Sequence, residues 1–285
     1  MSVRVQIAEK ADEFTANERK LSSAILADYP FAGLAPIQTL AEKTNVSAPT
    51  ISRFVTKLGY GGFQDFQQQL IAELKEGQKS PVDLHPTRRQ VEGDDYLKGF
   101  FQRAEQLLQE TCEMISASQF ERVCAMLSDD KRGLYLIGGR MSDPIVQYLS
   151  RHLRQYRANV FHLPSDPEVW PEYLLRMRPK DVLVTIDFRR YQKSLAELAH
   201  RAVHNQGARL VLITDKWMSP ISKDAQEVLP VPIDSGTVWD SYAATLALVE
   251  AIVARVTETN WDQTRNRIEA WDAARLNFEG RKNDQ

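Results

Sequence analysis

Five short apolar runs in the second half of the chain, separated by stretches with helical periodicity, limit the folds that it can adopt. The runs cover residues 134–137, 160–163, 182–186, 210–213 and 228–233. Because nearly every residue in each run is apolar, each strand is expected to be buried on both faces, as in a parallel sheet with helices on both sides. We therefore predict a C-terminal α/β doubly wound, five-stranded parallel-sheet domain of the flavodoxin type.

Helical patterns lie between these runs, at residues 144–156, 168–177, 192–205 and 242–256. In a doubly wound domain the ligand binds outside the carboxyl ends of the strands. The loops that follow the strands therefore contain the candidate ligand-binding residues. These loops cover residues 138–143, 187–191, 214–218 and 234–240.

The first 76 residues have a helical pattern throughout, and two of the expected helices are joined by a tight turn. Asn45 lies in this turn and tolerates a left-handed backbone conformation. The helix that follows covers residues 48–58, with Ser47 as its expected N-cap and Gly59 as its stop. Two short helices joined by such a turn are typical of a helix-turn-helix.

The helix over 48–58 has two unlike faces. Its apolar residues recur at helical spacing and predict a buried stripe, formed by Ile51, Phe54, Val55 and Leu58. The opposite face is polar and basic, and in a helix-turn-helix the second helix enters the major groove. The predicted DNA-binding residues are Ser47, Pro49, Thr50, Ser52, Arg53 and Lys57. Arg53 suits a guanine edge or a phosphate, and Lys57 suits a phosphate.

The overall charge does not by itself favour DNA binding. The chain has 36 basic and 38 acidic residues, and its first 76 residues have 8 basic and 9 acidic side chains. A small helical bundle whose solvated face happens to be basic therefore remains an alternative. A helix-turn-helix that only contacts other proteins is a further alternative.

Changes in composition along the chain predict its domain boundaries. We predict a helix-turn-helix domain over 1–76, a linker over 77–95 with two prolines and two glycines, a ligand-sensing and dimerisation domain over 96–260, and a helical tail over 261–285.

No apolar run approaches the roughly 20 residues that a membrane span needs, and no signal peptide is evident. The only cysteines, Cys112 and Cys124, exclude a disulfide scaffold. We expect a cytoplasmic protein without a membrane partner.

The N-terminal segment resembles a known family of DNA-binding domains. The run from Val46 to Phe54, with Ser47, Thr50 and Arg53, is followed by Lys57-Leu58-Gly59-Tyr60 and Gly62-Phe63. This pattern is similar to the N-terminal domain of the RpiR/MurR family of bacterial transcriptional regulators. The resemblance implies a regulator that binds a double-stranded, palindromic DNA operator.

Residues 100–257 resemble a sugar isomerase (SIS) domain, which RpiR/MurR regulators also contain. This resemblance implies a module that forms a homodimer or a higher homo-oligomer and senses a phosphosugar. The predicted effector-binding residues are Gly138, Arg140, Ser142, Asp187, Arg189, Arg190, Tyr191, Asp240 and Ser241. Asp240 and Ser241 suit a turn and a helix cap equally well.

Two loops depart from the SIS pattern. Arg140 stands where the first loop usually has its second glycine, and the usual Ser-x-Ser-Gly-x-Thr phosphate cradle is replaced by residues 187–192, Asp-Phe-Arg-Arg-Tyr-Gln. Arginines can bind an anion through bidentate hydrogen bonds. Asp187 would repel phosphate unless it pairs with an arginine or receives an amino group. We therefore expect an anionic or zwitterionic effector other than a standard phosphosugar. A degenerate site with an Asp187–Arg140 ion pair is the alternative.

The sequence predicts no metal and no cofactor. His200 and His204 have a spacing compatible with chelation, but no third ligand is evident near them in the sequence.

An SIS-type sugar-phosphate isomerase with a helical appendage is the alternative function. His162 and Glu168 would then be candidate bases. Because the usual phosphate anchor is missing, we expect a non-enzymatic regulator whose SIS-like domain senses a small anionic or carbohydrate-derived metabolite and modulates operator binding.

Overall fold

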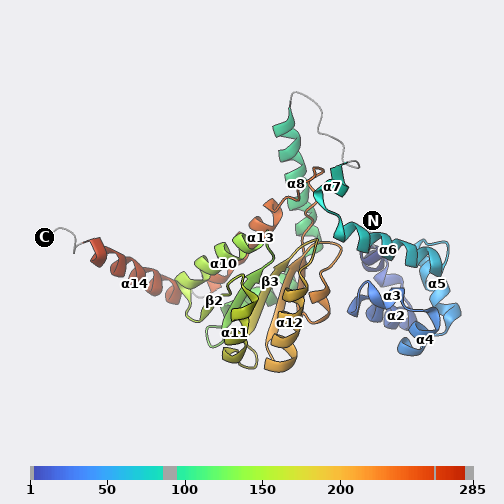
Figure 1. Ribbon diagram of the computed structural model, residues 1–285, viewed down its shortest axis with the longest axis horizontal. Coiled ribbons are helices and arrows are strands. Elements are labelled where there is room, and N and C mark those ends of the chain that lie inside the picture. The colour runs from blue at the N-terminus through green and yellow to red at the C-terminus, as the bar shows by residue number, and fades with distance from the viewer. Residues whose placement is uncertain (1–2, 86–94, 260, 280–285) are drawn as a thin grey trace.

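The computed structural model describes residues 3–85, 95–259 and 261–279 and shows a helical N-terminal domain followed by an α/β domain (Figure 1). The N-terminal domain contains α1 (Val3–Glu9), the 3-10 helix η1 (Ala11–Glu13), α2 (Ala16–Ala27), α3 (Phe31–Leu34), α4 (Ile37–Thr44), α5 (Ala48–Leu58) and α6 (Phe63–Gln78). The helix-turn-helix consists of α4 and α5. The short helices α1 and α3 were not predicted from the sequence.

The ends of the N-terminal helices follow local sequence signals. The Thr15 hydroxyl accepts the backbone N–H of Glu18, whose carboxylate in turn accepts the N–H of Thr15, so that α2 starts with a capping box. Asn45 ends α4 in the left-handed conformation with φ 52°, and Gly59 ends α5 with φ 110°. These turn predictions are confirmed. Ser47 does precede α5, but its hydroxyl bonds the Thr50 hydroxyl and caps no backbone N–H.

The C-terminal domain is built on a five-stranded, fully parallel sheet in the order β2-β1-β3-β4-β5. The strands are β1 (Leu134–Gly138), β2 (Val160–His162), β3 (Val182–Asp187), β4 (Arg209–Thr214) and β5 (Glu227–Pro230). The predicted doubly wound fold of the flavodoxin type is confirmed. The fifth strand is shorter than expected and ends at Pro230, which has no N–H to donate and pairs with Thr214, the last residue of β4.

Two hydrophobic cores cover the two faces of the sheet. Along β1, Leu134 and Leu136 belong to one core, and Tyr135 and Ile137 to the other. The first core is covered by α8 (Tyr96–Met114), α9 (Ala117–Ser128), α10 (Asp143–Tyr156) and α13 (Ala243–Thr259). The second is covered by the 3-10 helix η4 (Pro220–Lys223) and by α11 (Trp170–Arg176) and α12 (Lys193–Gln206), and the 3-10 helix η3 (Pro167–Val169) leads into α11.

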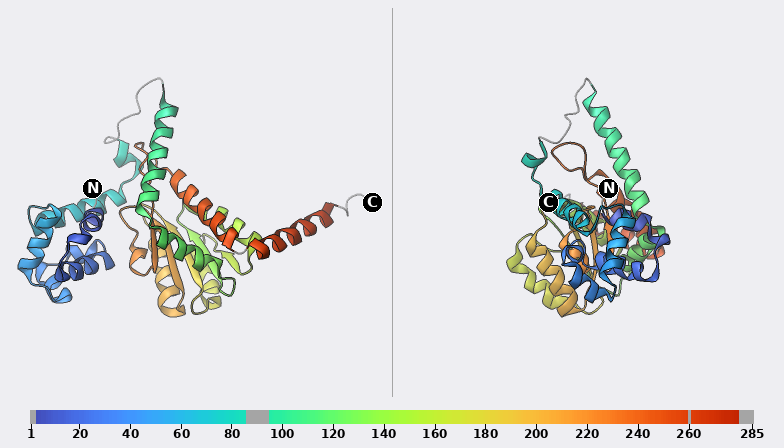
Figure 2. Two further views of the ribbon diagram at one scale, coloured as in Figure 1. Left: turned by 180° about the vertical axis from the view of Figure 1, so that it is seen from behind. Right: turned by 90° about the vertical axis from the view of Figure 1, so that its right-hand side faces the viewer.

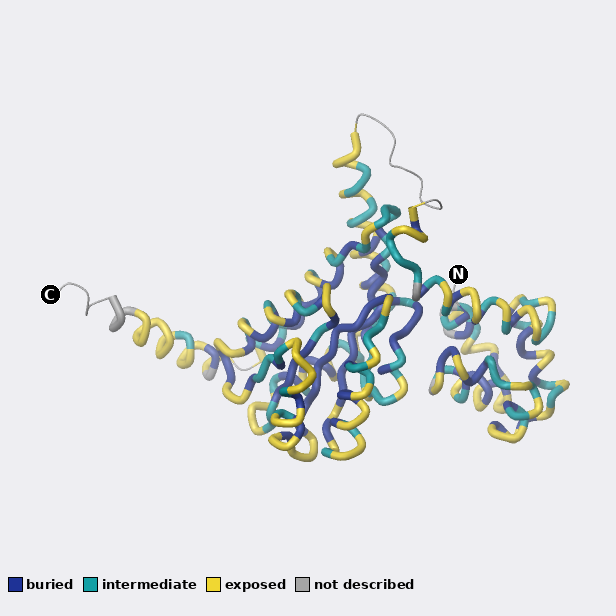
Figure 3. The backbone as a smooth tube through the Cα atoms, viewed as in Figure 1, coloured by how far each residue is buried: buried dark blue, intermediate teal, exposed yellow. Residues whose placement is uncertain are grey.

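The last helix, α14 (Trp261–Glu279), extends away from the α/β domain on the side opposite the N-terminal domain (Figure 2). Its start packs on α10, and much of the rest is exposed (Figure 3). Trp261 and Trp271 are both about half exposed. Within the described ranges, no helix combines the length and the apolar character that a membrane crossing needs.

The two domains are in direct contact. Met218, in the loop after β4, is buried in the same hydrophobic cluster as Phe66 and Leu70 of α6. The carbonyl of Gly77, near the end of α6, accepts the backbone N–H of Arg190 at 2.9 Å. The helix α6 therefore runs past the predicted domain boundary at residue 76 and reaches the loop after β3.

Candidate functional site

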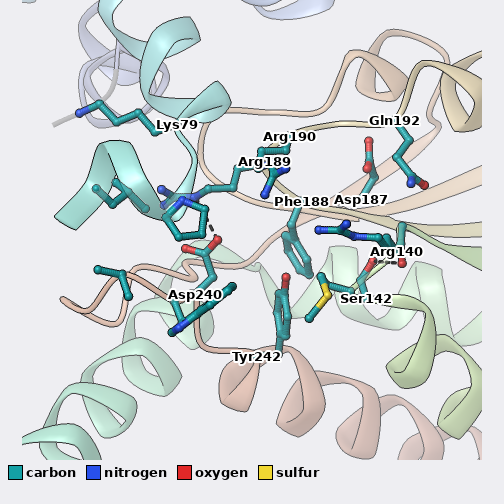
Figure 4. Close-up of a pocket in the computed structure, with 16 residues that line it drawn as sticks. Lys79, Arg140, Ser142, Asp187, Phe188, Arg189, Arg190, Gln192, Asp240 and Tyr242 are labelled. Carbon is teal, nitrogen blue, oxygen red and sulfur yellow. Dashed lines mark hydrogen bonds and ion pairs between the residues drawn. The ribbon is translucent and has the colours of Figure 1, made fainter.

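A pocket of about 320 Å³ lies at the carboxyl ends of β1 and β3, where the fold predicts a ligand (Figure 4). Six of the nine predicted effector-binding residues line it, namely Arg140, Ser142, Asp187, Arg189, Arg190 and Asp240. They come from the loops after β1 and β3 and from the segment that precedes α13. The pocket thus combines the three arginines that the sequence analysis selected with two carboxylates.

The other three predicted residues support the loops and do not line the pocket. The N–H of Gly138 donates to the Asp143 carboxylate at 3.0 Å, and the Tyr191 hydroxyl donates to Asp215 at 2.6 Å. The Ser241 hydroxyl accepts the N–H of Ala243 at the start of α13, as a helix-capping residue does.

Sequence reasoning missed part of the pocket wall. Lys79, Pro81 and Leu84 line the pocket, although the sequence analysis assigned them to a linker. Pro81 and Leu84 belong to a short helix, α7 (Pro81–Leu84), which begins with a capping box between Ser80 and Asp83. The Ser-Pro-x-Asp signal for this helix is visible in the sequence, whereas its position over the pocket depends on tertiary contacts. Phe188, Gln192, Trp239 and Tyr242 complete much of the remaining wall.

Arg189 is the most buried cation of the pocket. Its side chain is only 3% exposed, its guanidinium lies over the Trp217 ring at 4.2 Å, and its Nε is 3.2 Å from the Asp240 carboxylate. Among the described residues, none completes a hydrogen bond with any of its three side-chain nitrogens. Buried N–H groups without acceptors are costly. An anion in the pocket would supply the missing acceptors.

Asp187, at the end of β3, is not paired with any arginine within the described parts of the chain. Its carboxylate accepts the Ser219 hydroxyl at 2.5 Å and is almost fully buried. Burial raises its pKa to about 7, and the nearby Asp215 carboxylate acts in the same direction. Near neutral pH, Asp187 is therefore partly protonated, which weakens the repulsion of an anion that its charge would cause.

We expect anion binding to weaken as the pH rises through the pKa of Asp187. The ionised carboxylate repels the anion, so the affinity for sulfate should fall about tenfold or more between about pH 6 and about pH 8. Titration calorimetry can measure this change, and sulfate keeps a constant charge over the range. Asp187→Asn should flatten the profile. An equally steep profile in this variant would assign the effect to another group.

Asp215 supports the loop that follows β3. It is fully buried and accepts the backbone N–H groups of Arg189 and Trp217 in addition to the Tyr191 hydroxyl. Burial raises its pKa to about 6, although these hydrogen bonds act in the opposite direction. The loop with Arg189 and Arg190 is therefore held by one buried carboxyl.

The predicted DNA-binding face of α5 is exposed, with one exception. The Ser47 and Thr50 hydroxyls are 2.9 Å apart, and the Arg53 guanidinium donates to Thr50 at 3.3 Å. These three side chains form a hydrogen-bonded row on the surface, next to the exposed Ser52. Pro49 occupies the first turn of α5, as expected.

Lys57 is the exception on this face. Its ammonium donates to the Glu13 carbonyl at 2.6 Å and to the Glu18 carboxylate at 3.2 Å, and it lies over the Phe14 ring. It thus joins the end of α5 to the start of α2. Lys57 is therefore engaged in contacts within the domain, and its phosphate contact stays a prediction.

The two candidate bases of the isomerase alternative lie outside the pocket. The His162 imidazole is within 3.0 Å of the Asp143 carboxylate, and Glu168 is exposed on η3. Neither lines the cavity beside the arginines.

Comparisons with known proteins find two family models that match separate parts of the chain. A model of the SIS domain matches residues 109–255, and a model of the helix-turn-helix domain of the rpiR family matches residues 1–77. The HTH-type transcriptional regulator HexR of Escherichia coli (strain K12) is 26% identical over 242 residues, which cover 83% of this chain and 80% of HexR.

Two solved structures share the fold. The sugar isomerase domain of an RpiR transcription factor from Sphaerobacter thermophilus has a TM-score of 0.58 at 16% identity and covers 63% of this chain and 99% of its own. The Vibrio vulnificus NanR protein complexed with ManNAc-6P has a TM-score of 0.54 at 19% identity and covers 96% of this chain and 98% of its own. The chain belongs to the RpiR family of transcriptional regulators, with an RpiR-type helix-turn-helix domain followed by an SIS domain.

Proposed function

We propose that the protein binds a DNA operator through α5, and that a small anionic, carbohydrate-derived ligand in the SIS pocket changes its operator affinity. The observation that carries this proposal is the direct connection between the two sites. The helix α6 of the DNA-binding domain ends at Gln78, and the next residues, Lys79, Pro81 and Leu84, line the ligand pocket. The proposed activity is regulatory and cytoplasmic, and it needs no catalytic step or cofactor.

The connection gives a ligand a means of favouring one position of the DNA-binding domain. The backbone N–H of Arg190 donates to the Gly77 carbonyl of α6, and Arg190 adopts a left-handed conformation with φ 66°. The neighbouring Arg189 has the buried guanidinium that would bind the anion. A ligand that rearranges this loop changes the contact with α6, and such differential contacts are what a population shift requires.

The chemistry of the pocket favours an anion. Arg140, Arg189, Arg190 and Lys79 provide four cations, against Asp240 and a partly protonated Asp187. NanR, with the same fold, was solved with a sugar phosphate, which supports a sugar phosphate or a related sugar acid as the ligand class. In this chain guanidinium groups take the place of the serine-rich cradle. We therefore keep the expectation that the preferred ligand differs from a standard phosphosugar.

A homodimer would present two copies of α5 to a palindromic operator, with half-sites about one helical turn apart. The outward face of α8 has exposed apolar side chains, including Leu97 and Phe101, which are both about two-thirds exposed. We assign these side chains to a contact with a second copy of the chain.

Fluorescence anisotropy can test the DNA-binding part of the proposal. The full chain is titrated onto labelled DNA from upstream of its own gene, over a series of salt concentrations and with a scrambled duplex as control. We expect tight binding that falls with salt and is lost on the scrambled duplex. A panel of phosphosugars, sugar acids and the matching neutral sugars is then added. Equal binding to both duplexes at every salt concentration and with every ligand would contradict the proposal.

Substitution of Gly77 tests the coupling between the sites. A Cβ atom at this position would lie 3.2 Å from Trp217 Cβ and 3.4 Å from the Tyr191 hydroxyl, so Gly77→Val should push α6 away from the loop. We expect this variant to bind the ligand and the operator separately, with the effect of ligand on operator affinity reduced about fivefold or more. Gly61→Val, where a Cβ atom would be in ordinary contact with the Asp65 carboxylate at 3.7 Å, is the control. Unchanged coupling in Gly77→Val would exclude this route.

A further inference from the structure

Three potential metal ligands converge on the surface formed by α12 and η4, away from the effector pocket. His200 and His204 lie one turn apart on α12, and Asp224 follows η4 directly. The His200 Nδ1 atom is 3.1 Å from one oxygen of the Asp224 carboxylate, and the His204 Nε2 atom is 3.0 Å from the other. The three ligand atoms all lie within 4.8 Å of one another.

These distances are close to those that a tetrahedral metal site needs. Zinc binds imidazole nitrogen and carboxylate oxygen at roughly 2.0–2.2 Å, so that two ligands at a tetrahedral angle lie roughly 3.3 Å apart. The two observed nitrogen–oxygen separations are within a few tenths of an ångström of this value, with each imidazole facing a different oxygen of Asp224. An ion would draw the ligand atoms, which lie within 4.8 Å of one another, to these distances by rotation of the side chains.

We propose that His200, His204 and Asp224 form a surface site for a divalent transition metal, with zinc as the reference ion. Two imidazoles and a carboxylate suit zinc, nickel, cobalt and copper better than magnesium or calcium, which prefer oxygen ligands. The histidine side chains are about half exposed, so water would complete the coordination. The sequence showed the histidine spacing, but Asp224 is 20 residues from His204, and only the fold brings it close.

The Asp224 carboxylate is already oriented toward both imidazoles. The Asp224 side chain is only 8% exposed, which restricts it to its present orientation between the two imidazoles. Metal ligands must be deprotonated, so an ion would displace the protons that now lie between the imidazole nitrogens and the carboxylate. In the alternative, the three groups form only a surface ion-pair network.

A metal ion here would connect η4 to α12. The residue before η4 is Ser219, whose hydroxyl donates to Asp187 in the effector pocket. The ion would thus stabilise a segment whose other end supports the pocket, while the three ligands themselves remain outside it.

The test is a titration of the full chain with zinc, after removal of any polyhistidine tag. Calorimetry should show one equivalent of zinc per chain. His204→Ala and Asp224→Asn should each weaken binding by about tenfold or more, since each removes one of three ligands. Titration with cobalt(II) should give a visible absorption band that the same two variants remove.

Two control variants exclude other zinc ligands on the surface. Cys112 is an exposed thiol and His85 an exposed imidazole, so Cys112→Ser and His85→Ala should both bind zinc like the parent protein. The proposal is wrong if the parent binds no zinc, if His204→Ala and Asp224→Asn bind as tightly as the parent, or if only Cys112→Ser loses binding. Circular dichroism of each variant shows whether the fold is retained, and His200→Ala provides an independent replacement of one ligand.

Discussion

Replacement of Arg189 by methionine is expected to weaken anion binding by about 30-fold or more and to lower the free energy of unfolding by about 1–3 kcal/mol. The affinity falls because the guanidinium is the buried cation of the pocket and, apart from its ion pair with Asp240, its N–H groups have no acceptor among the described residues. The stability falls because methionine removes the guanidinium that pairs with the Asp240 carboxylate and lies over the Trp217 ring. Calorimetry with sulfate and with the best ligand of the panel, together with chemical denaturation, measures both quantities.

A matched control is Arg151→Met, which removes an exposed arginine on α10. We expect this variant to bind anions and to unfold like the parent protein. If Arg189→Met instead unfolds much more easily and still binds the ligand, Arg189 is a structural residue that stacks on Trp217. Anion binding would then have to be assigned to Arg140 and Arg190.

The second large effect concerns the DNA-binding face. Arg53→Ala is expected to weaken specific operator binding by about 5- to 150-fold, which corresponds to the roughly 1–3 kcal/mol of a base-contacting arginine. Its guanidinium is exposed on α5 in a row with Thr50 and Ser47. Anisotropy on the operator and on the scrambled duplex, at matched salt, separates base recognition from phosphate contact.

Lys57→Ala gives the contrasting result, because its ammonium joins α5 to Glu13 and Glu18. We expect operator affinity to change less than twofold and the free energy of unfolding to fall by no more than about 1 kcal/mol, since the pair is partly exposed. A loss of operator affinity as large as that of Arg53→Ala would mean that Lys57 leaves Glu18 for a DNA phosphate.

The fold could be predicted because its determinants are local and repeated. Each strand coincides largely with a run of apolar residues, and the turns of the helix-turn-helix have residues suited to them, such as Asn45 and Gly59. The short helices α1 and α3 escaped prediction because their few residues have no clear periodicity. Their packing against α5 and α6 supplies what their sequences do not.

The site was predicted where it depends on the ends of strands and missed where it depends on contacts between domains. Arg140, Asp187 and Arg189 follow β1 and β3, so their position follows from the topology. Lys79 and Leu84 lie in a segment without periodicity, and only the packing of α6 against the loop after β3 brings them to the pocket. The hydrogen bonds of Lys57 to Glu13 and Glu18 could not be predicted from the sequence either, because these residues are about 40 positions away.

The helix α6 can also be considered as a lever. Its 16 residues span about 24 Å, with Gly77 near one end and the contact with α5 near the other. A tilt of about 5° about Gly77 would move the far end by about 2 Å. In the proposed dimer the two displacements add to about 4 Å, which exceeds the roughly 3.4 Å rise of one base pair. A rotation of a few degrees at the pocket would therefore be enough to take two recognition helices out of register with a fixed pair of half-sites.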